Sequence, residues 1–399
     1  MAVVYLDNNA TTRVDPRIVR AMLPFFTESF GNASSTHDYG AAVAPALKQA
    51  RKQVQDLLGA EFDHEVVFTS GGTESDTTAI LSALEASPER NEIITSAVEH
   101  PAVLNVCQHL ERTGRARVHV IGVGSSGDLD LDAYRAALSE KTALVSIMWA
   151  NNETGTIFPV SEFAALAKAA GALFHTDAVQ AFGKIELALK DKAIDLLSLS
   201  GHKIHGPKGV GALYVKKGVK LSPLFRGGKQ ERGRRAGTEN VPGIVGLGMA
   251  AEIARENLAA DQARVKMLRN RLESGLLAAI PLARVNGAGD NRLPNTCNIS
   301  FDYADGEAVL HKLDRAGIAA SSGSACASGS MEPSHVLRAL NIPPYALQGA
   351  IRFSLSREST EDDVSRVLAA LPAIVAHARE KSPLWAEIRP SQVHPSQVA

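Results

Sequence analysis

The sequence of 399 residues has few cysteines, no long apolar run and almost no net charge. Its cysteines, Cys107, Cys297 and Cys326, are odd in number, lie far apart and form no C-x-x-C pair, which argues against a disulfide framework and a structural zinc site. No run of about 18 apolar residues occurs, so no membrane-spanning helix is expected. A net charge of -1 offers no bulk attraction to nucleic acid or an anionic membrane. Small molecules and proteins are therefore the expected partners.

The N-terminal stretch MAVVYLDNNATTR also lacks the basic and apolar segments of a secretory signal. We therefore expect a cytoplasmic protein. The length leaves room for two or three domains with a large core. Any cysteine with a chemical role must act singly, because none has a partner nearby in the sequence.

Short apolar runs alternate with helical patterns through the first two thirds of the chain. The runs predicted as strands are 65–69, 92–95, 117–120, 143–149, 173–176, 196–199 and 211–215. The stretches with helical spacing are 17–26, 41–58, 74–86, 101–113, 131–138 and 161–170. This alternation indicates an α/β fold with a mostly parallel, helix-covered sheet.

A long helical stretch at 242–277 leads to a second region. There the pattern predicts strands at 296–301 and 351–355, helices at 306–316 and 361–381, and a Ser/Gly-rich loop at 321–330. The tail after residue 383 is proline-rich and polar, and we expect it to be loose.

The segment TSGGTES, residues 69–75, follows a strand and opens a helix. The free N–H groups of such a helix start favour a bound anion. It is not a P-loop, because no Gly-Lys-Ser/Thr follows. A plain turn capped by Thr73 or Ser75 is the alternative.

Three more polar segments come at or after strand ends. HTDAVQ, 175–180, places Asp177 at the end of an apolar strand, where a buried carboxylate needs a positive partner, although a helix cap is the ordinary alternative. EHPAV, 99–103, puts His100 before a proline-started helix, a position that favours a capping or packing role. NNETG, 151–155, is an amide-rich turn.

The stretch SLSGHKIHGPKGVG, residues 198–211, sets Lys203 on a turn between two strands. A lysine held there by Ser200, His202 and His205 could keep a depressed pKa of roughly 7–8 and serve as Schiff-base former and proton carrier. A solvated surface turn is the ordinary alternative.

Two glycine patterns resemble dinucleotide-binding sites but lack the required context. GVGSSG, 122–127, follows a strand, but the residues beyond its third glycine are DLDLD and not a helix. GLGMAA, 246–251, lies inside a helical stretch. We therefore expect no dinucleotide site.

The anion site, the amide turn, the aspartate and the lysine all follow strands of one predicted sheet, and ligands of open α/β sheets bind at the carboxyl ends of the strands. An anion cradle, a carboxylate that keeps a ring nitrogen protonated and a lysine that forms an imine are together what pyridoxal phosphate requires. Their joint occurrence favours that cofactor over four separate structural roles.

Many segments resemble those of the cysteine desulfurases, which are fold-type I pyridoxal-phosphate enzymes of the class V aminotransferase group. They are YLDNNATT, FGNASSTH, FTSGGTESD, EHPAV, MWANNETG, HTDAVQ, SLSGHKIHGPKG, RGGKQERGRRAGTEN, SSGSACASGS, EPSHVLRAL and IRFSLSR. The wording of MWANNETGT and RRAGTEN is most similar to the nitrogen-fixation (NifS-like) subgroup.

The resemblance implies a large domain with a mostly parallel seven-stranded sheet and a smaller α+β C-terminal domain. We expect the large, cofactor-binding domain at 15–258. The small domain would combine 1–14 with 259–385 and carry the persulfide loop, leaving 386–399 as the tail.

The resemblance also implies roles for individual residues. Lys203 would hold the cofactor as a Schiff base and later move the substrate α-proton, and Lys208 would be a turn residue. Asp177 would pair with the pyridinium nitrogen, Gln180 would bond the ring oxygen, and His100 would stack on the ring.

The phosphate and the substrate would be held by further matching residues. The implied phosphate ligands are Gly72, Thr73, Ser200, His202 and, from the partner subunit, Thr238. The substrate carboxylate would be held by Asn152 and Arg352, since a bidentate arginine suits that geometry.

The implied reaction converts L-cysteine to L-alanine and leaves a persulfide on Cys326, with Lys203, Cys326 and His100 as catalytic residues. A homodimer would pass the sulfur to an iron–sulfur scaffold protein, in a pathway of the nitrogenase type. No fixed metal site is implied, although Cys326 could ligate an iron–sulfur cluster transiently during sulfur transfer. The alternatives are a class V transaminase, a selenocysteine lyase and a catalytically silent sulfur carrier; for Cys326 itself the alternative is a buried packing residue.

Overall fold

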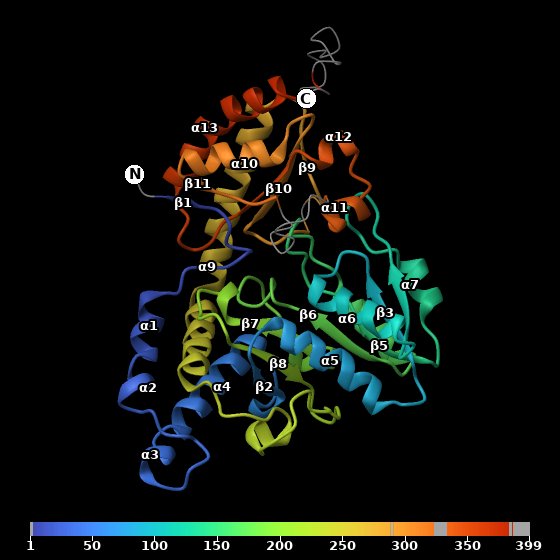
Figure 1. The fold of residues 1–399 in the computed structure, drawn as a ribbon, viewed down its shortest axis with the longest axis vertical. Helices are drawn as coiled ribbons and strands as arrows, with labels where there is room; N and C mark the ends of the chain where they lie inside the picture. Colours follow the sequence, from blue (N-terminus) through green and yellow to red (C-terminus); the bar gives the residue numbers. More distant parts are fainter. Residues whose placement is uncertain (1–2, 288, 290, 323–332, 383–384, 386–399) are drawn as a thin grey trace.

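The computed structural model describes residues 3–287, 289, 291–322, 333–382 and 385. Two regions lie one above the other in Figure 1, and helix α9 (Val241–Ala279) extends from the lower into the upper one. Among the described residues, no helix is both long and apolar enough to cross a bilayer.

The lower region is built on a seven-stranded sheet in the order β2-β8-β7-β6-β5-β3-β4. The strands are β2 (Val66–Thr69), β3 (Glu92–Ser96), β4 (Arg117–Ile121), β5 (Thr142–Ser146), β6 (Leu173–Asp177), β7 (Leu196–Ser200) and β8 (Gly211–Val215). Only β8 runs antiparallel to its neighbours. Most of these strands are buried at every residue, so both sheet faces are covered, which explains their continuous apolar runs. The predicted mostly parallel sheet of seven strands is confirmed.

The longer helices of this region lie at the predicted stretches, except that one stretch is divided and a short helix at 38–41 was not predicted. They are α1 (Pro16–Met22), α2 (Pro24–Thr27), α3 (Asp38–Ala41), α4 (Ala44–Leu58), α5 (Gly72–Ala86), α6 (Pro101–Arg112), α7 (Leu131–Ala137) and α8 (Val160–Ala169), with short 3₁₀ turns η1 (Asp63–Glu65), η2 (Leu189–Asp191), η3 (Gly201–Lys203) and η4 (Gln230–Gly233). The single helix expected at 17–26 is wrong: Pro24 starts a second helix, because proline has no N–H to continue the first.

The glycines of GLGMAA serve helix packing. They lie within α9, and a Cβ atom on Gly248 would stand 2.5 Å from the Cα atom of Ala50 in α4. The two helices therefore approach as closely as their backbones allow. This packing accounts for a glycine pattern that resembles a nucleotide motif.

The upper region has its own core around a three-stranded antiparallel sheet. Its strands are β9 (Ala283–Val285), β10 (Thr296–Phe301) and β12 (Ala350–Ser354), and its helices are α10 (Gly306–Arg315), α12 (Pro344–Leu347) and α13 (Glu361–Glu380). Helix α11 (His335–Ala339) packs its buried residues against the core of the lower region. A separate two-residue strand, β1 (Val4–Tyr5), pairs in parallel with β11 (Ile318–Ala319). The N-terminal residues thus join the upper region, although the next segment enters the lower one.

Candidate active site

A cavity of about 390 Å³ lies at the carboxyl ends of the sheet strands. It brings together ten residues that the sequence predicts for the site: Gly72, Thr73, His100, Asn152, Asp177, Gln180, Ser200, His202, Lys203 and Arg352. Strands β2, β5, β6 and β7 all end on this side, because the antiparallel β8 lies between β2 and β7 and leaves those two pointing the same way.

The start of helix α5 forms one wall of this cavity. Its N-cap, Gly71, has no side chain, so no side-chain hydrogen bond closes the helix start. The Ser75 hydroxyl bonds the Gly71 carbonyl instead, and the alternative of a turn capped by Thr73 or Ser75 is wrong. Gly72 and Thr73, the first residues of this helix, line the cavity together with Ser200, and the free N–H groups of a helix start suit a phosphate.

Asp177 ends strand β6 and is buried, and its Oδ1 accepts a hydrogen bond of 2.9 Å from the Val179 N–H. Burial raises the pKa of Asp177, while the charges of His100 and Lys203 act to lower it. A positive group in the cavity would further stabilise the ionised carboxylate.

A second carboxyl group, Asp76, lines the same cavity beside Asp177 and was missed by the sequence analysis. Burial and the charge of Asp177 raise the pKa of Asp76. Its Oδ1 has no hydrogen-bond partner within the described residues and lies 3.6 Å from Nε2 of His175. His175 is bonded to Ser146 and Ser198, and burial lowers its pKa to about 3, so it stays neutral. Two buried carboxyl groups whose pKa is raised by burial fit a protonated ring nitrogen, which would stabilise their charge.

Lys203 lies in the η3 turn between β7 and β8, as predicted. Its Nζ donates to the main-chain carbonyls of Asn9 at 2.6 Å and Ala10 at 2.8 Å. Lys208 is exposed and does not line the cavity. The geometry therefore separates the two lysines of this segment.

His100 has the capping role that the sequence favoured, and it also lines the cavity. It is the N-cap of α6, where its Nδ1 accepts a hydrogen bond of 3.1 Å from the Ala102 N–H, and its ring also lines the cavity. The cap fixes the ring in place.

Arg352 reaches the cavity from strand β12 of the upper region. Only 2% of it is exposed, and its guanidinium donates to the Asn152 carbonyl at 3.1 Å and to Asp7 Oδ1 at 2.7 Å. These contacts hold an arginine beside Asn152, where a carboxylate could bind.

Two predicted site residues do not line this cavity. Thr238 lines a separate cavity of about 210 Å³ with Arg235 and Gly209. Cys326 lies outside the described residues.

The sequence analysis also missed residues brought in by distant contacts. Asn9, Glu153 and His335 line the cavity. Nε2 of His335 lies 2.9 Å from the carbonyl oxygen of Glu99, and the Ser334 hydroxyl donates to Glu153 at 2.6 Å. Asn9 and His335 stand in the segments YLDNNATT and EPSHVLRAL, which were noted for the resemblance but given no role.

Comparison with known proteins identifies the family of this chain. The family model described as Aminotransferase class-V matches residues 4–367. A cysteine desulfurase of Gluconacetobacter diazotrophicus is 66% identical over 385 residues, which cover 96% of each chain. The cysteine desulfurase NifS of Azotobacter vinelandii is 59% identical, again over 96% of each chain. The chain belongs to the cysteine desulfurase family. Among solved structures, a NifS-like protein matches this desulfurase fold with a TM-score of 0.88 and 39% identity, covering 94% of this chain and all of that one.

Cysteine desulfurases of this class are pyridoxal-phosphate enzymes, and pyridoxal 5′-phosphate is the cofactor of this chain. The cavity fits it: an uncapped helix start for the phosphate, buried carboxyl groups for the ring nitrogen and the Lys203 amine for the aldehyde. The predicted fold type and cofactor are confirmed. The roles of single residues remain predictions.

Proposed function

We propose that this enzyme converts L-cysteine to L-alanine and transfers the sulfur to its own Cys326. The observation that carries the proposal is one cavity that holds Lys203, the buried Asp177 and Arg352 together. When bound, the cofactor supplies an electrophilic carbon for the substrate amine and a ring that accepts electrons.

Residues of this chain bind the substrate, transfer protons and hold the cofactor. Arg352 and Asn152 bind the substrate carboxylate, which orients the α-carbon. The Nζ atom of Lys203 takes the α-proton and later returns a proton to the product. With the cofactor bound, Asp177 would keep the ring nitrogen protonated and His100 would pack on the ring.

In the sulfur-transfer step the Cys326 thiolate attacks the sulfur of the substrate. A new S–S bond forms, the carbon–sulfur bond breaks, and its electron pair remains on the carbon fragment, which is protonated and released as alanine. The products are alanine and a persulfide on Cys326, so atoms and electrons balance. An added thiol reductant then releases sulfide.

The other two cysteines are matched controls for Cys326. Cys107 and Cys297 are buried, and burial raises the pKa of the Cys107 thiol to about 12 and that of Cys297 well above its ordinary value. A thiol without access to its thiolate form is a poor nucleophile.

The test measures sulfide and alanine from L-cysteine with a reductant. Cys326→Ala should retain the yellow cofactor and bind L-cysteine, yet lose nearly all of both products, while Cys107→Ala and Cys297→Ala stay active. Near-native desulfuration by Cys326→Ala would refute the persulfide step. A keto acid formed from an amino donor, without sulfide, would favour a transaminase instead.

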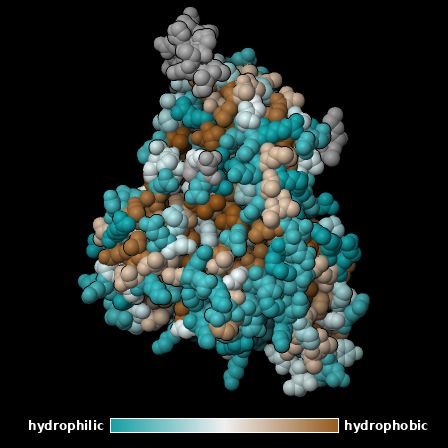
Figure 2. Space-filling model, turned by 180° about the vertical axis from the view of Figure 1, so that it is seen from behind, coloured by the Kyte–Doolittle hydropathy of each residue, from teal (hydrophilic) through white to brown (hydrophobic). Residues whose placement is uncertain are grey.

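We also propose a homodimer. Thr238 stands outside the cavity of its own chain, and helices α1 to α3 and the adjoining loops expose large apolar side chains: Leu23, Phe26, Phe30 and Tyr39, each 55–64% exposed. In Figure 2 the part of the molecule formed by helices α1 to α3 lies at the lower right, where white and tan residues of intermediate hydropathy lie among the hydrophilic ones. A second copy covering it would bury this surface. Sedimentation should show dimers; fully active monomers would refute the proposal.

The physiological acceptor we propose is an iron–sulfur scaffold protein in the cytoplasm. The similarity to the NifS of Azotobacter vinelandii supports a role in nitrogenase cluster assembly. Transfer of ³⁵S from labelled L-cysteine to a purified scaffold protein, lost with Cys326→Ala, tests this acceptor.

A further inference from the structure

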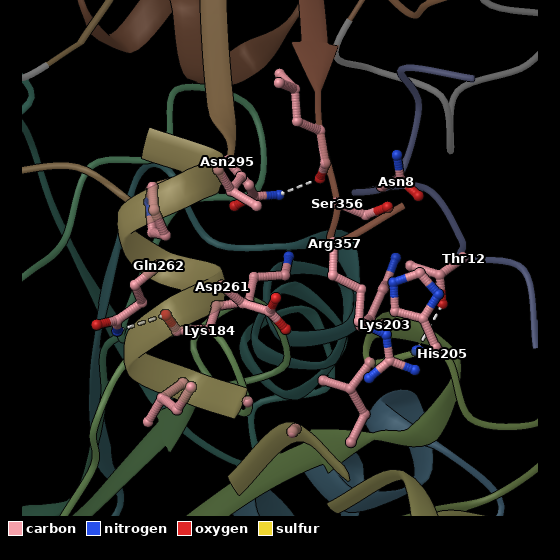
Figure 3. Close-up of a pocket in the computed structure, with 17 residues that line it drawn as sticks. Asn8, Thr12, Lys184, Lys203, His205, Asp261, Gln262, Asn295, Ser356 and Arg357 are labelled. Carbon is pink, nitrogen blue, oxygen red and sulfur yellow. Dashed lines mark hydrogen bonds between the residues drawn. The ribbon is translucent and has the colours of Figure 1, made fainter. Parts of the chain in front are cut away.

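A second, smaller cavity of about 60 Å³ lies on another side of Lys203, where the lower region, α9 and the upper region meet (Figure 3). We call it the rear cavity. Its polar lining is Asn8, Thr12, Lys184, Lys203, His205, Asp261, Gln262, Asn295, Ser356 and Arg357. It has room for a few water molecules but not for the substrate.

Lys184 is a deeply placed amine that the proposed mechanism does not use. Its Nζ donates to Oε1 of Gln180 at 2.7 Å and to Oδ1 of Asn9 at 3.1 Å. Burial and the neighbouring charges of Lys203 and Arg352 lower its pKa well below the ordinary value. An amine donates to both oxygens with or without its third proton, so these contacts persist in either state.

These contacts fix which way the Gln180 amide points. Its Nε2 donates to the Asn9 carbonyl at 3.0 Å, while its oxygen accepts from Lys184. A flipped amide would set its oxygen against the Asn9 carbonyl oxygen and its NH₂ against the amine. Nε2 has two N–H bonds, so the second one remains to serve an acceptor on the cavity side.

Asn9 connects the same amine to the reactive lysine. Its main-chain carbonyl accepts from Lys203, and its side-chain oxygen accepts from Lys184 and, at 2.9 Å, from Asn295. Its Nδ2 donates to the carbonyl of Asn152 at 3.0 Å. Asn9 is only 1% exposed, so this network exchanges little with solvent.

We propose that Lys184 is a positioning residue, whose amine holds Gln180 and Asn9 so that Gln180 presents an N–H donor to the cofactor and Asn9 keeps the carbonyl that receives Lys203. This inference rests on the proposed function, since it assumes a cofactor with an acceptor oxygen beside Gln180. It assigns a role to a lysine outside every recognised motif.

A double-mutant cycle on purified holoenzyme tests the inference. Lys184→Met and Gln180→Leu should each shift the absorption maximum of the bound cofactor and weaken cofactor affinity by roughly tenfold, as for one lost buried hydrogen bond. The effects of the two changes should be clearly less than additive in the double variant, because both remove the contact between Lys184 and Gln180. Lys190→Met, a change at an exposed lysine nearby, should match the wild type.

If Lys184→Met does not fold, Lys184→Arg provides the test. Its guanidinium retains N–H donors and its extra atoms can occupy the rear cavity, so the wild-type spectrum should return. A Lys184→Met enzyme with wild-type spectrum and affinity, additive effects in the double variant, or a Lys184→Arg spectrum shifted away from wild type would each overturn the inference. Wild-type protein that binds no pyridoxal phosphate would overturn the proposed function as well.

Discussion

The two cavities that share Lys203 differ in how they are built. The larger is lined mainly by residues that follow strand ends, while the rear cavity draws on the N-terminal segment, α9 and the end of β12. Polar residues directly after buried strands are conspicuous in a sequence, whereas a lysine such as Lys184 looks like any surface lysine. Groups that would contact the cofactor were therefore predictable, and the groups that support them were not.

The largest expected effect is at the lysine that both cavities share. Lys203→Ala should abolish the covalent, borohydride-reducible cofactor link, because among the described residues Lys203 is the lysine that lines the larger cavity, while the fold persists. Lys208→Ala should keep the link, since Lys208 is exposed and outside the larger cavity. Absorption spectra and mass after borohydride reduction measure this. Loss of the link in Lys208→Ala alone would contradict the assignment.

Asp177 is expected to matter next. Asp177→Ala should bind the cofactor but lose turnover by roughly 10²-fold or more, because an unprotonated ring accepts electrons poorly. Asp191→Ala, at an exposed position in η2, is the control. Sulfide release under saturating L-cysteine gives the rate, and near-wild-type turnover would disprove this role.

Two arginines allow a direct test of the difference between the cavities. Arg352→Lys should raise KM for L-cysteine by about tenfold with a smaller change in kcat, because lysine keeps the charge but loses the bidentate geometry. Arg357→Lys, in the rear cavity, should leave KM unchanged. Steady-state kinetics measures both KM values. Equal increases in KM for the two variants would contradict a substrate-binding role that is specific to Arg352.

The smallest effect concerns stability alone. The Asp15 carboxylate bonds Arg17 and, at 2.8 Å, Arg357, and chiefly the hydrogen bond from Arg17 holds its pKa well below the ordinary value. Because the folded-state pKa is depressed, the stabilisation is fully present above about pH 4 and is lost as the pH falls toward that lower value. Asp15→Asn should cost about 1 kcal/mol at pH 7 and less in acid, with KM unchanged. Urea unfolding at pH 7 and pH 3 checks this; a cost that does not shrink in acid would exclude the carboxylate charge as its source.

Local patterns predicted most of the fold. The range 296–301 matches β10 at both ends, and the other main strands agree within a few residues. The two-residue strands β1 and β11 were missed, because a pair so short depends on contact between distant segments and not on a local pattern. Strand β9 and helices α11 and α12 were missed for similar reasons of length.

The site shows the same division. Lys203 and Asp177 were identified by residue type and position, but Asn9 was not, since its importance comes from a carbonyl and an amide that meet residues far along the chain. Its main-chain N–H, for example, donates to the hydroxyl of Ser354 at 2.9 Å. The domain boundary at 258/259 stays a prediction.

The pairing of Val4 with Ile318 has a consequence for biosynthesis. A ribosome that adds about 5–20 residues per second needs roughly 15–60 s to pass from one to the other. During that interval β1 has no partner strand, and the Asn9 and Ala10 carbonyls that receive Lys203 are not yet anchored by β12. Although this segment is among the first residues made, the growing chain cannot complete the Lys203 site before the upper region emerges, because Arg352 of β12 lines the same cavity.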